Sequence, residues 1–191
     1  MSPLSSEEKS FLLRLARRAV EERLSGATAS VPDPSSQTPA MERPAGVFVT
    51  LHKQGELRGC VGMVEPRLPL YRAVREAAVA AAFADPRFAP LGATELADVD
   101  FEISVLSPSR PVTLEQIQVG AHGLIVTQGR ARGLLLPQVA VERDWDARRF
   151  LEETCRKAGL AADAWRAGAR VEAFQAEVFG ERSLASKKPS G

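Results

Sequence analysis

The sequence has few of the residues that hold metals or form disulfide frameworks. Its 191 residues include 2 histidines and 2 cysteines, and no two of these side chains stand at the short spacings of a structural zinc site. A small secreted domain would need more cysteines for its disulfides. We therefore expect no bound metal and no cofactor, and a reducing, cytoplasmic compartment. The four residues are His52, His122, Cys60 and Cys155.

Long apolar runs and an excess of either charge are also missing. The most apolar run, Ala77–Ala84, is shorter than the stretch of about 18 residues that indicates a membrane span. The start, Met1–Ser5, lacks the basic and apolar regions of a signal peptide. The 25 Lys and Arg residues against 24 Asp and Glu leave a net charge of +1, which disfavours nucleic acid or anionic lipid as a partner.

Three common catalytic signatures are absent as well. The sequence holds no Gly-x-x-x-x-Gly-Lys loop for nucleotide phosphates, and no glycine triplet of the dinucleotide-binding kind follows a strand. No serine has glycine two places before and two places after it, as the nucleophile elbow of a hydrolase requires. These absences disfavour nucleotide hydrolysis and serine hydrolysis.

What is present begins with a set of helices. Ser5–Glu8 has the hydroxyl and carboxylate spacing of a capping box, so we expect a helix from there to about Leu24. A second helix over about 70–84 is apolar nearly all round and ends at Asp85-Pro86, which predicts a central position. A third helix is expected over 146–158.

The remaining regular segments have the composition of strands. Val47–Leu51 and Leu57–Val61 surround one short turn, and Leu124–Thr127 and Ala131–Leu136 surround another, so two hairpins are expected. Helices scattered between hairpins, without regular alternation, predict an α+β fold with a mainly antiparallel sheet and packed helices. Two further strands are expected over Val99–Val105 and Val171–Phe179.

Two segments have no expected regular structure. Residues 25–45 hold four prolines among Ser, Thr and Ala, and we expect a surface loop inside a single domain over residues 1–181. Such a long loop leaves open whether the first helix is docked or is a mobile arm. The polar residues 182–191 are expected to form a disordered tail.

The first hairpin allows two registers, which place different side chains on one face. A three-residue loop ending at Gly55 pairs Leu51 with Leu57 and keeps one face apolar. A two-residue loop would scatter Arg58 and Cys60 among the valines. We predict the three-residue loop, which gathers the following on the opposite face: Phe48, Thr50, His52, Arg58 and Cys60.

The segment Arg58–Gly62 places the thiol of Cys60 between two glycines, Gly59 and Gly62. Glycine weakens a strand interior, so the close approach of a ligand or a neighbouring chain would explain this pattern. Arg58 could lower the pKa of the thiol and bind a carboxylate or phosphate, while His52 could serve as the base. The competing interpretation is that Cys60 is a small packing residue, as most cysteines are.

The turn Asp85–Phe88 also admits two interpretations. In the structural one, which we favour, Arg87 binds the last carbonyls of the preceding helix or pairs with a carboxylate, and Phe88 fills the core. In the functional one, Asp85 and Arg87 point into a cleft and bind a ligand.

Three other residues are assigned structural roles. Cys155 lies on the apolar stripe of its helix and is expected in the core. His122 stands at a strand entry and is interpreted as a turn residue, and Gln138 is interpreted as a loop amide.

Five segments resemble, in order, the successive blocks of the AMMECR domain family. They are Gly46–Leu51, Leu57–Gly62, Asp85–Phe88, Glu102–Leu106 and Leu135–Ala140. With an opening at Leu15–Arg17 and a close at Cys155–Leu160, the resemblance covers roughly residues 5–181. The Arg-Gly-Cys-x-Gly block is the most specific, and Val61 stands where isoleucine is commoner.

The resemblance implies a two-part α+β fold and, in prokaryotes, association with Memo-like and radical-SAM proteins in the AmmeMemoRadiSam system. It brings no established reaction. The chain has no Cys-x-x-x-Cys-x-x-Cys motif for an iron–sulfur cluster, so any radical or metal chemistry would belong to the partners.

Two hypotheses of different class follow. In the first, the chain is an accessory binding module that docks on a partner, and Arg58–Gly62 only keeps the hairpin packed. In the second, it is an enzyme or enzyme component whose small polar cleft around Arg58, Cys60, His52 and Asp85 binds an anionic small molecule or a modified chain. A deep polar cleft would favour the enzyme, and an exposed apolar patch on the first helix or second hairpin would favour the module.

Overall fold

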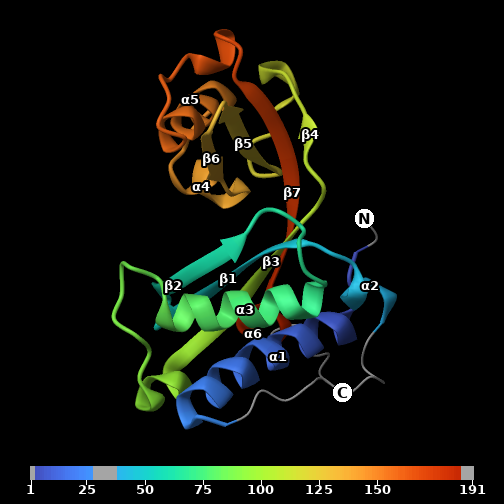
Figure 1. Cartoon of the computed structure of the whole chain (residues 1–191), viewed down its shortest axis with the longest axis vertical. Coiled ribbons are helices and arrows are strands. Elements are labelled where there is room, and N and C mark those ends of the chain that lie inside the picture. Colours follow the sequence, from blue (N-terminus) through green and yellow to red (C-terminus); the bar gives the residue numbers. More distant parts are fainter. Residues whose placement is uncertain (1–2, 28–37, 186–191) are drawn as a thin grey trace. The chain divides into compact units, whose positions relative to one another are not determined.

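The computed structural model describes residues 3–27 and 38–185, which form two compact units (Figure 1). The first unit holds the described residues up to Val105 and from Glu177 on, and the second holds Leu106–Ala176. Most of the expected Pro-rich loop, residues 28–37, and the end of the expected tail, residues 186–191, lie outside the described residues.

The first unit contains two long helices and several short ones. α1 begins with the predicted capping box: the Glu8 N–H donates to Ser5 Oγ at 3.2 Å, and the Ser5 N–H donates to the Glu8 carboxylate at 2.7 Å. It ends at Gly26, whose φ of 68° caps the helix. The helices are α1 (Ser6–Ser25), α2 (Pro39–Glu42), α3 (Leu70–Phe83), the 3-10 helix η2 (Ala93–Asp98) and α6 (Glu181–Ala185). The tail was expected from residue 182, and the chain is helical to Ala185.

The strands of the first unit are β1 (Gly46–Lys53), β2 (Glu56–Met63), β3 (Val99–Leu106) and the end of β7 (Arg170–Gly180). They follow the order β2-β1-β3-β7. Figure 1 shows α1 and α3 side by side in this unit, and α3 packs on β1 and β2. The core between them is built from aliphatic and aromatic side chains, including Leu12, Val49, Leu51, Val74 and Phe101. α1 is therefore a docked part of the unit.

The second unit is smaller and has its own core. Its strands are β4 (Arg110–Pro111), β5 (His122–Gln128), β6 (Ala131–Leu135) and the first part of β7, in the order β7-β5-β6 with β4 on β7. Its helices are α4 (Pro137–Glu142), α5 (Ala147–Lys157) and the 3-10 helices η3 (Leu114–Gln116) and η4 (Ala164–Arg166). Side chains of α5 and β5 fill the core, among them Phe150, Leu151, Cys155, Leu124 and Val126.

The α+β class is confirmed, and the pairings β1–β2, β5–β6, β5–β7 and β4–β7 are antiparallel. Cys155 is fully buried, as predicted. Gln138 lies in α4 rather than in a loop, because Pro137 occupies the first turn of that helix. Within residues 3–27 and 38–185, no helix is long and apolar enough to cross a membrane.

The predicted register of the first hairpin is wrong. Lys53 pairs with Glu56 across a two-residue turn, in which Gln54 and Gly55 have φ of 54° and 90°. The sequence analysis disfavoured a two-residue turn because, without a bulge, it would place Cys60 on the same face as the valines. A bulge removes the objection: Arg58 is an extra residue in β2, between the pairs Leu51–Gly59 and His52–Leu57.

The bulge restores the polar face beyond it. Thr50 pairs with Cys60, so their side chains share a face opposite Val49, as predicted. Leu57 pairs with His52 instead of Leu51, and it is 41% exposed. The extra residue thus shifts the register by one more residue, so the pairs beyond it are not the predicted ones, but Thr50 and Cys60 share the expected face.

Candidate functional site

The edge of β2 carries the first of two polar clusters. β2 pairs only with β1 among the described strands, so the Cys60 N–H points away from β1. This N–H donates to Asp85 Oδ2 at 2.9 Å. Asp85 follows α3 directly, and its carboxylate also accepts from the Arg87 backbone N–H and from the Arg87 guanidinium at 2.9 and 2.6 Å. We call Cys60, Asp85 and Arg87 the edge cluster.

The edge cluster holds a buried carboxylate in its ionised form. Asp85 is only 5% exposed. Hydrogen bonds from the Arg87 side chain, then from the backbone N–H groups of Cys60 and Arg87, hold the pKa of Asp85 well below its usual range despite burial. Two of the residues proposed for ligand binding therefore bind each other, and Asp85 closes an open strand edge.

Arg58 forms the second polar cluster with Glu95 and Lys53. Its Nη2 donates to Glu95 Oε2 at 3.0 Å and to the Ala89 carbonyl at 3.0 Å, and Lys53 Nζ donates to Glu95 Oε1 at 3.0 Å. The Arg58 side chain is only 14% exposed. Its hydrogen bonds, and those of Lys53 and of the Gly92 N–H, lower the pKa of Glu95 to about 2. We call Arg58, Glu95 and Lys53 the Arg58 cluster.

The edge cluster and the Arg58 cluster are separate, with a different carboxylate in each. The enzyme hypothesis placed Arg58 and Asp85 in one cleft, but each arginine has its own carboxylate: Arg58 binds Glu95, and Arg87 binds Asp85. The aromatic ring of Phe88 lies near both guanidinium groups, at 5.9 Å from Arg58 and 5.4 Å from Arg87. Arg87 thus pairs with a carboxylate, as in the structural interpretation, whereas Phe88 is half buried and is not one of the core residues of the described chain.

The two glycines of the motif are explained by packing inside the first unit. A Cβ built on Gly59 would overlap the carbonyl oxygen of Ala81 in α3. A Cβ built on Gly62 would overlap the carbonyl oxygen of Val47 and the side chain of Phe48. Both positions therefore require glycine because the chain's own atoms approach them, and no ligand is needed to explain them.

The thiol of Cys60 remains partly accessible on the face that it shares with Thr50. The Thr50 hydroxyl donates to Cys60 Sγ at 3.3 Å. His52 is the next residue on the same face of β1, and its imidazole makes no hydrogen bond to the thiol within the described residues. The predicted pair of nucleophile and base shares a face without being in contact.

Sequence analysis missed Glu95, which organises the Arg58 cluster. Glu95 lies in η2, 37 residues from Arg58 in the chain. Its one local signal is the hydrogen bond from the Gly92 N–H to Glu95 Oε2 at 3.2 Å, the backbone half of a capping box. No hydroxyl residue stands at Gly92, so the usual signature of that box is missing.

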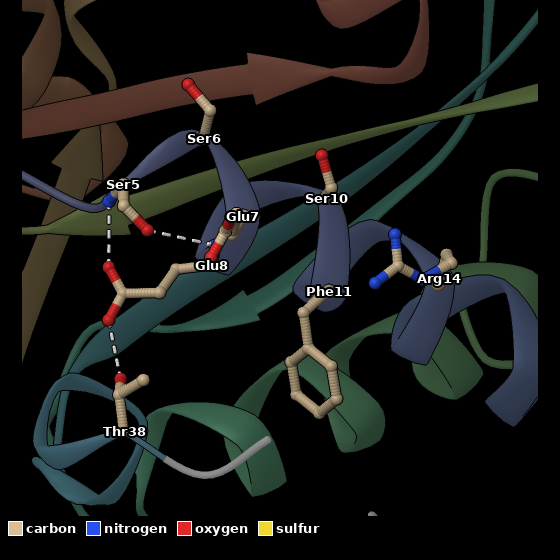
Figure 2. Close-up of a pocket in the computed structure, with 8 residues that line it drawn as sticks. All are labelled: Ser5, Ser6, Glu7, Glu8, Ser10, Phe11, Arg14 and Thr38. Carbon is tan, nitrogen blue, oxygen red and sulfur yellow. Dashed lines mark hydrogen bonds between the residues drawn. The ribbon is translucent and has the colours of Figure 1, made fainter. Parts of the chain in front are cut away.

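His122 and a surface hollow at the start of α1 are two further candidate sites. His122 begins β5 and is 2% exposed, and its Nδ1 accepts from the Gln118 N–H at 3.2 Å. Burial, and then the charge of Arg110, lower the pKa of its imidazole. A hollow of about 600 Å³ at the start of α1 includes Glu8, whose carboxylate is already bound by Ser5 and Thr38 (Figure 2). Both sets of polar groups serve the local fold.

The clusters also show which chemistry the site can perform. Asp85 and Glu95 are held ionised by arginines, so neither has the pKa near neutrality that suits a general acid or base. Among residues 3–27 and 38–185, no three His, Cys, Asp or Glu side chains gather as metal ligands. The reactive group beside these clusters is the Cys60 thiol. Arg58 and Arg87 are each paired with a carboxylate, while Arg58 Nη1 is buried without a hydrogen-bond partner among the described residues.

Comparisons with known proteins agree in assigning the chain to one family. The family model described as AMMECR1 matches residues 13–179. A protein of Thermofilum pendens is 49% identical to this chain, and the match covers 95% of this chain and 93% of the relative. A protein of Methanothermobacter thermautotrophicus is 48% identical, and the match covers 94% of this chain and 97% of the relative. The crystal structure of the uncharacterized protein PH0010 from Pyrococcus horikoshii has a TM-score of 0.87 and 42% identity, covering 93% of each chain. The chain, with its Arg-Gly-Cys-x-Gly strand fixed between α3 and the turn at Asp85, belongs to the AMMECR1 family.

Proposed function

We propose that the chain is an accessory binding module that acts together with Memo-like and radical-SAM proteins. The partners are those that the AMMECR resemblance implies. The observation that carries the proposal is that charged and backbone groups in and beside the most specific motif bind one another, although Arg58 Nη1 is buried without a hydrogen-bond partner among the described residues. Arg58 is bound by Glu95, Arg87 is bound by Asp85, and the Cys60 N–H is bound by Asp85.

This arrangement favours a scaffold over a catalytic centre. A cysteine nucleophile is commonly activated by an adjacent base or by a nearby positive charge, whereas the group bonded to Cys60 Sγ is the hydroxyl of Thr50. The motif glycines accommodate the backbone of α3 and of β1. What the motif supplies is a rigid hairpin, and rigid elements make good supports for a binding surface.

The proposal is tested with purified proteins from one organism. The full chain is mixed with the Memo-like protein, with the radical-SAM protein and with both, and the complexes are measured by isothermal titration calorimetry and size-exclusion chromatography. We expect a defined complex with at least one partner and a Kd in the micromolar range or tighter, about 8 kcal/mol of binding free energy or more. An absence of binding to either partner, alone or combined, would overturn the proposal.

The second candidate function is an enzyme component that binds an anionic small molecule at Arg58 and Cys60. The observation in its favour is the accessible thiol, which accepts a hydrogen bond from Thr50 at 3.3 Å on the face that also carries His52. Inorganic phosphate is the probe: it should raise the melting temperature of the wild type and not that of Arg58→Met. An activity of the reconstituted partners that requires Cys60, and not Cys155, would also favour the enzyme.

A further inference from the structure

A loop before β5 is closed by the buried side chain of His122. The loop, residues 117–121, connects the 3-10 helix η3 to β5. The Gln118 N–H donates to His122 Nδ1 at 3.2 Å, and the His122 N–H donates to the Gln118 carbonyl oxygen at 2.9 Å. His122 is only 2% exposed, so its imidazole has little contact with water. We call residues 117–121 the His122 loop.

Little else holds the His122 loop in place. Ile117 packs into the core of the second unit, whereas residues 118–121 are exposed. Gly120 has a φ of 84°, and a Cβ built on it would lie 3.3 Å from Val141 Cγ2 of α4. Among residues 3–27 and 38–185, His122 is the only residue whose side chain hydrogen-bonds to the loop. The closed loop therefore depends on this imidazole as an acceptor.

An imidazole can accept this hydrogen bond only in its neutral form. One nitrogen of a neutral imidazole is an acceptor and the other is a donor, whereas both nitrogens of the protonated ring are donors. After protonation, Nδ1–H and the Gln118 N–H would point at each other, with no acceptor between them. The charged ring would also lie in a buried position, where an unpaired charge is unfavourable. Protonation of His122 and the closed loop therefore exclude each other.

The groups around His122 favour the neutral ring. Burial, and then the positive charge of Arg110 in β4, lower the pKa of the imidazole. The residue opposite His122 on β7 is the uncharged Gln175. The neighbouring elements α4 and η3 each carry one titratable residue, Glu142 and Glu115, and both residues are exposed. No carboxylate among the described residues offsets the charge of Arg110 at the imidazole.

We propose that His122 is an acid-sensitive switch, whose protonation opens the His122 loop while the strands of the second unit stay paired. Histidine in an open segment has a pKa of about 6.5, and the buried imidazole has a lower one. The open loop therefore binds the proton more tightly, so the closed loop is favoured above about pH 6.5 and loses stability as the pH falls below that value. Opening withdraws Ile117 from the core and moves Gly120 away from Val141. The surface that the loop forms with α4 is thus present near neutral pH and lost in acid, whatever partner the chain binds.

The test follows individual amides of the full chain by NMR, in a nitrogen-15 labelled sample, from about pH 7.5 to about pH 5. The protection factor compares the exchange rate of each amide with that of an unfolded chain at the same pH, so it removes the ordinary effect of pH on exchange. We expect the protection factor of the Gln118 amide to fall at least about tenfold as the His122 ring titrates, with a midpoint below about pH 6.5. The amides of β5, β6 and β1 should keep their protection.

Three variants sharpen the test. His122→Asn keeps an acceptor oxygen close to the position of Nδ1 and does not titrate, so the protection of its Gln118 amide should not change with pH. Arg110→Met removes, from an exposed position, the charge that disfavours protonation, so the midpoint should move to higher pH. The matched control is His52→Asn, the same substitution at the other histidine of the chain, which lies in the first unit and should leave the transition of Gln118 unchanged.

Three results would overturn the switch. They are constant protection of the Gln118 amide in the wild type, the same loss in acid in His122→Asn, and a loss in Gln118, β5 and β6 at the same pH, which would be unfolding of the whole unit. If His122→Asn does not fold, Arg110→Met decides. A midpoint that stays at the wild-type pH overturns the switch, and a midpoint that rises supports it.

Discussion

The hairpins β1–β2 and β5–β6 are alike in their turns and differ in what lies beyond the second strand. Both have two-residue turns, at Gln54-Gly55 and at Gly129-Arg130. In both, a glycine of the second strand faces a helix backbone. A Cβ on Gly59 would overlap Ala81 of α3, and a Cβ on Gly133 would overlap Ala158 at the end of α5. In both hairpins, therefore, a glycine of the second strand allows a helix backbone to pack closely on the strand.

The difference between the hairpins lies in the bulge and its polar neighbours. β5 and β6 pair in unbroken register from Leu124–Leu135 to Gln128–Ala131. β2 has the extra residue Arg58, and beside it stand the Arg58 cluster and the edge cluster. The comparison teaches that glycine in the Arg-Gly-Cys block does not by itself indicate a ligand. The feature that distinguishes the first hairpin is the bulge at Arg58, with the two polar clusters beside it.

The largest effect is expected from filling the two glycine positions. Gly59→Ala and Gly133→Ala should each lower the free energy of unfolding by about 3 kcal/mol, because a methyl group would press on helix backbone that cannot move away cheaply. Gly129→Ala is the control, since nothing lies within 4 Å of its Cβ position and only its φ of 60° opposes the change. That control should cost about 1 kcal/mol. Urea denaturation measures all three, and a Gly59→Ala variant no weaker than the control would refute the shared packing device.

A smaller effect is expected at the edge cluster. Asp85→Ala removes the acceptor of the Cys60 N–H and leaves Arg87 without its carboxylate, so it should lower the free energy of unfolding by about 2 kcal/mol. Asp98→Ala, at an exposed position of η2, is the control and should change stability by less than about 0.5 kcal/mol. Equal stability of the two variants would mean that the edge cluster contributes nothing to the fold.

The Arg58 cluster should contribute less, and its contribution should depend on pH. Glu95→Gln removes a charge that is held by Arg58 and Lys53, and we expect a loss of about 1 kcal/mol at pH 7. The folded pKa of Glu95, about 2, lies below its unfolded value, so the carboxylate stabilises the fold above the unfolded pKa. That stabilisation is lost as the pH falls from about 4.5 to about 2. Chemical denaturation across this range should show the wild type and the variant converging, and a pH-independent difference would contradict the assignment.

The last prediction involves no change in stability. Cys60 is partly accessible, whereas Cys155 is fully buried and burial raises the pKa of its thiol. Iodoacetamide should therefore alkylate Cys60 first in the native protein, as timed peptide mapping would show. The unfolded protein, in which both thiols react, is the control. Equal and slow reaction of both native thiols would remove Cys60 as a reactive group and end the enzyme hypothesis.

Local patterns predicted the elements well, because their causes are local. The capping box at Ser5 and Glu8 fixes the start of α1, and the apolar stripe of α5 places Cys155 in the core. The bulge at Arg58 could not be predicted in this way. One inserted residue leaves the alternation of apolar and polar side chains intact on either side of it. Without a bulge, a two-residue turn would place Arg58 and Cys60 among the valines, and for that reason the three-residue loop was predicted.

The candidate site could be predicted in part. The sequence identified Cys60, Asp85 and Arg87, which the structure brings together, since they lie in two of the most distinctive segments. It did not identify Glu95, the carboxylate that binds Arg58, because Glu95 lies 37 residues away in a short 3-10 helix without a hydroxyl cap.

Hydrogen exchange at the Cys60 amide tests most directly the claim that Asp85 closes the edge of β2 at the Arg-Gly-Cys block. The amide faces the open edge of β2, where Asp85 is its acceptor. In a nitrogen-15 labelled sample, it should exchange as slowly as the amides of the paired strand β1, and Asp85→Ala should remove this protection while the amides of β5 and β6 stay protected. Fast exchange of the Cys60 amide in the wild type would contradict the account, because the edge would then be open to a ligand or to a partner strand.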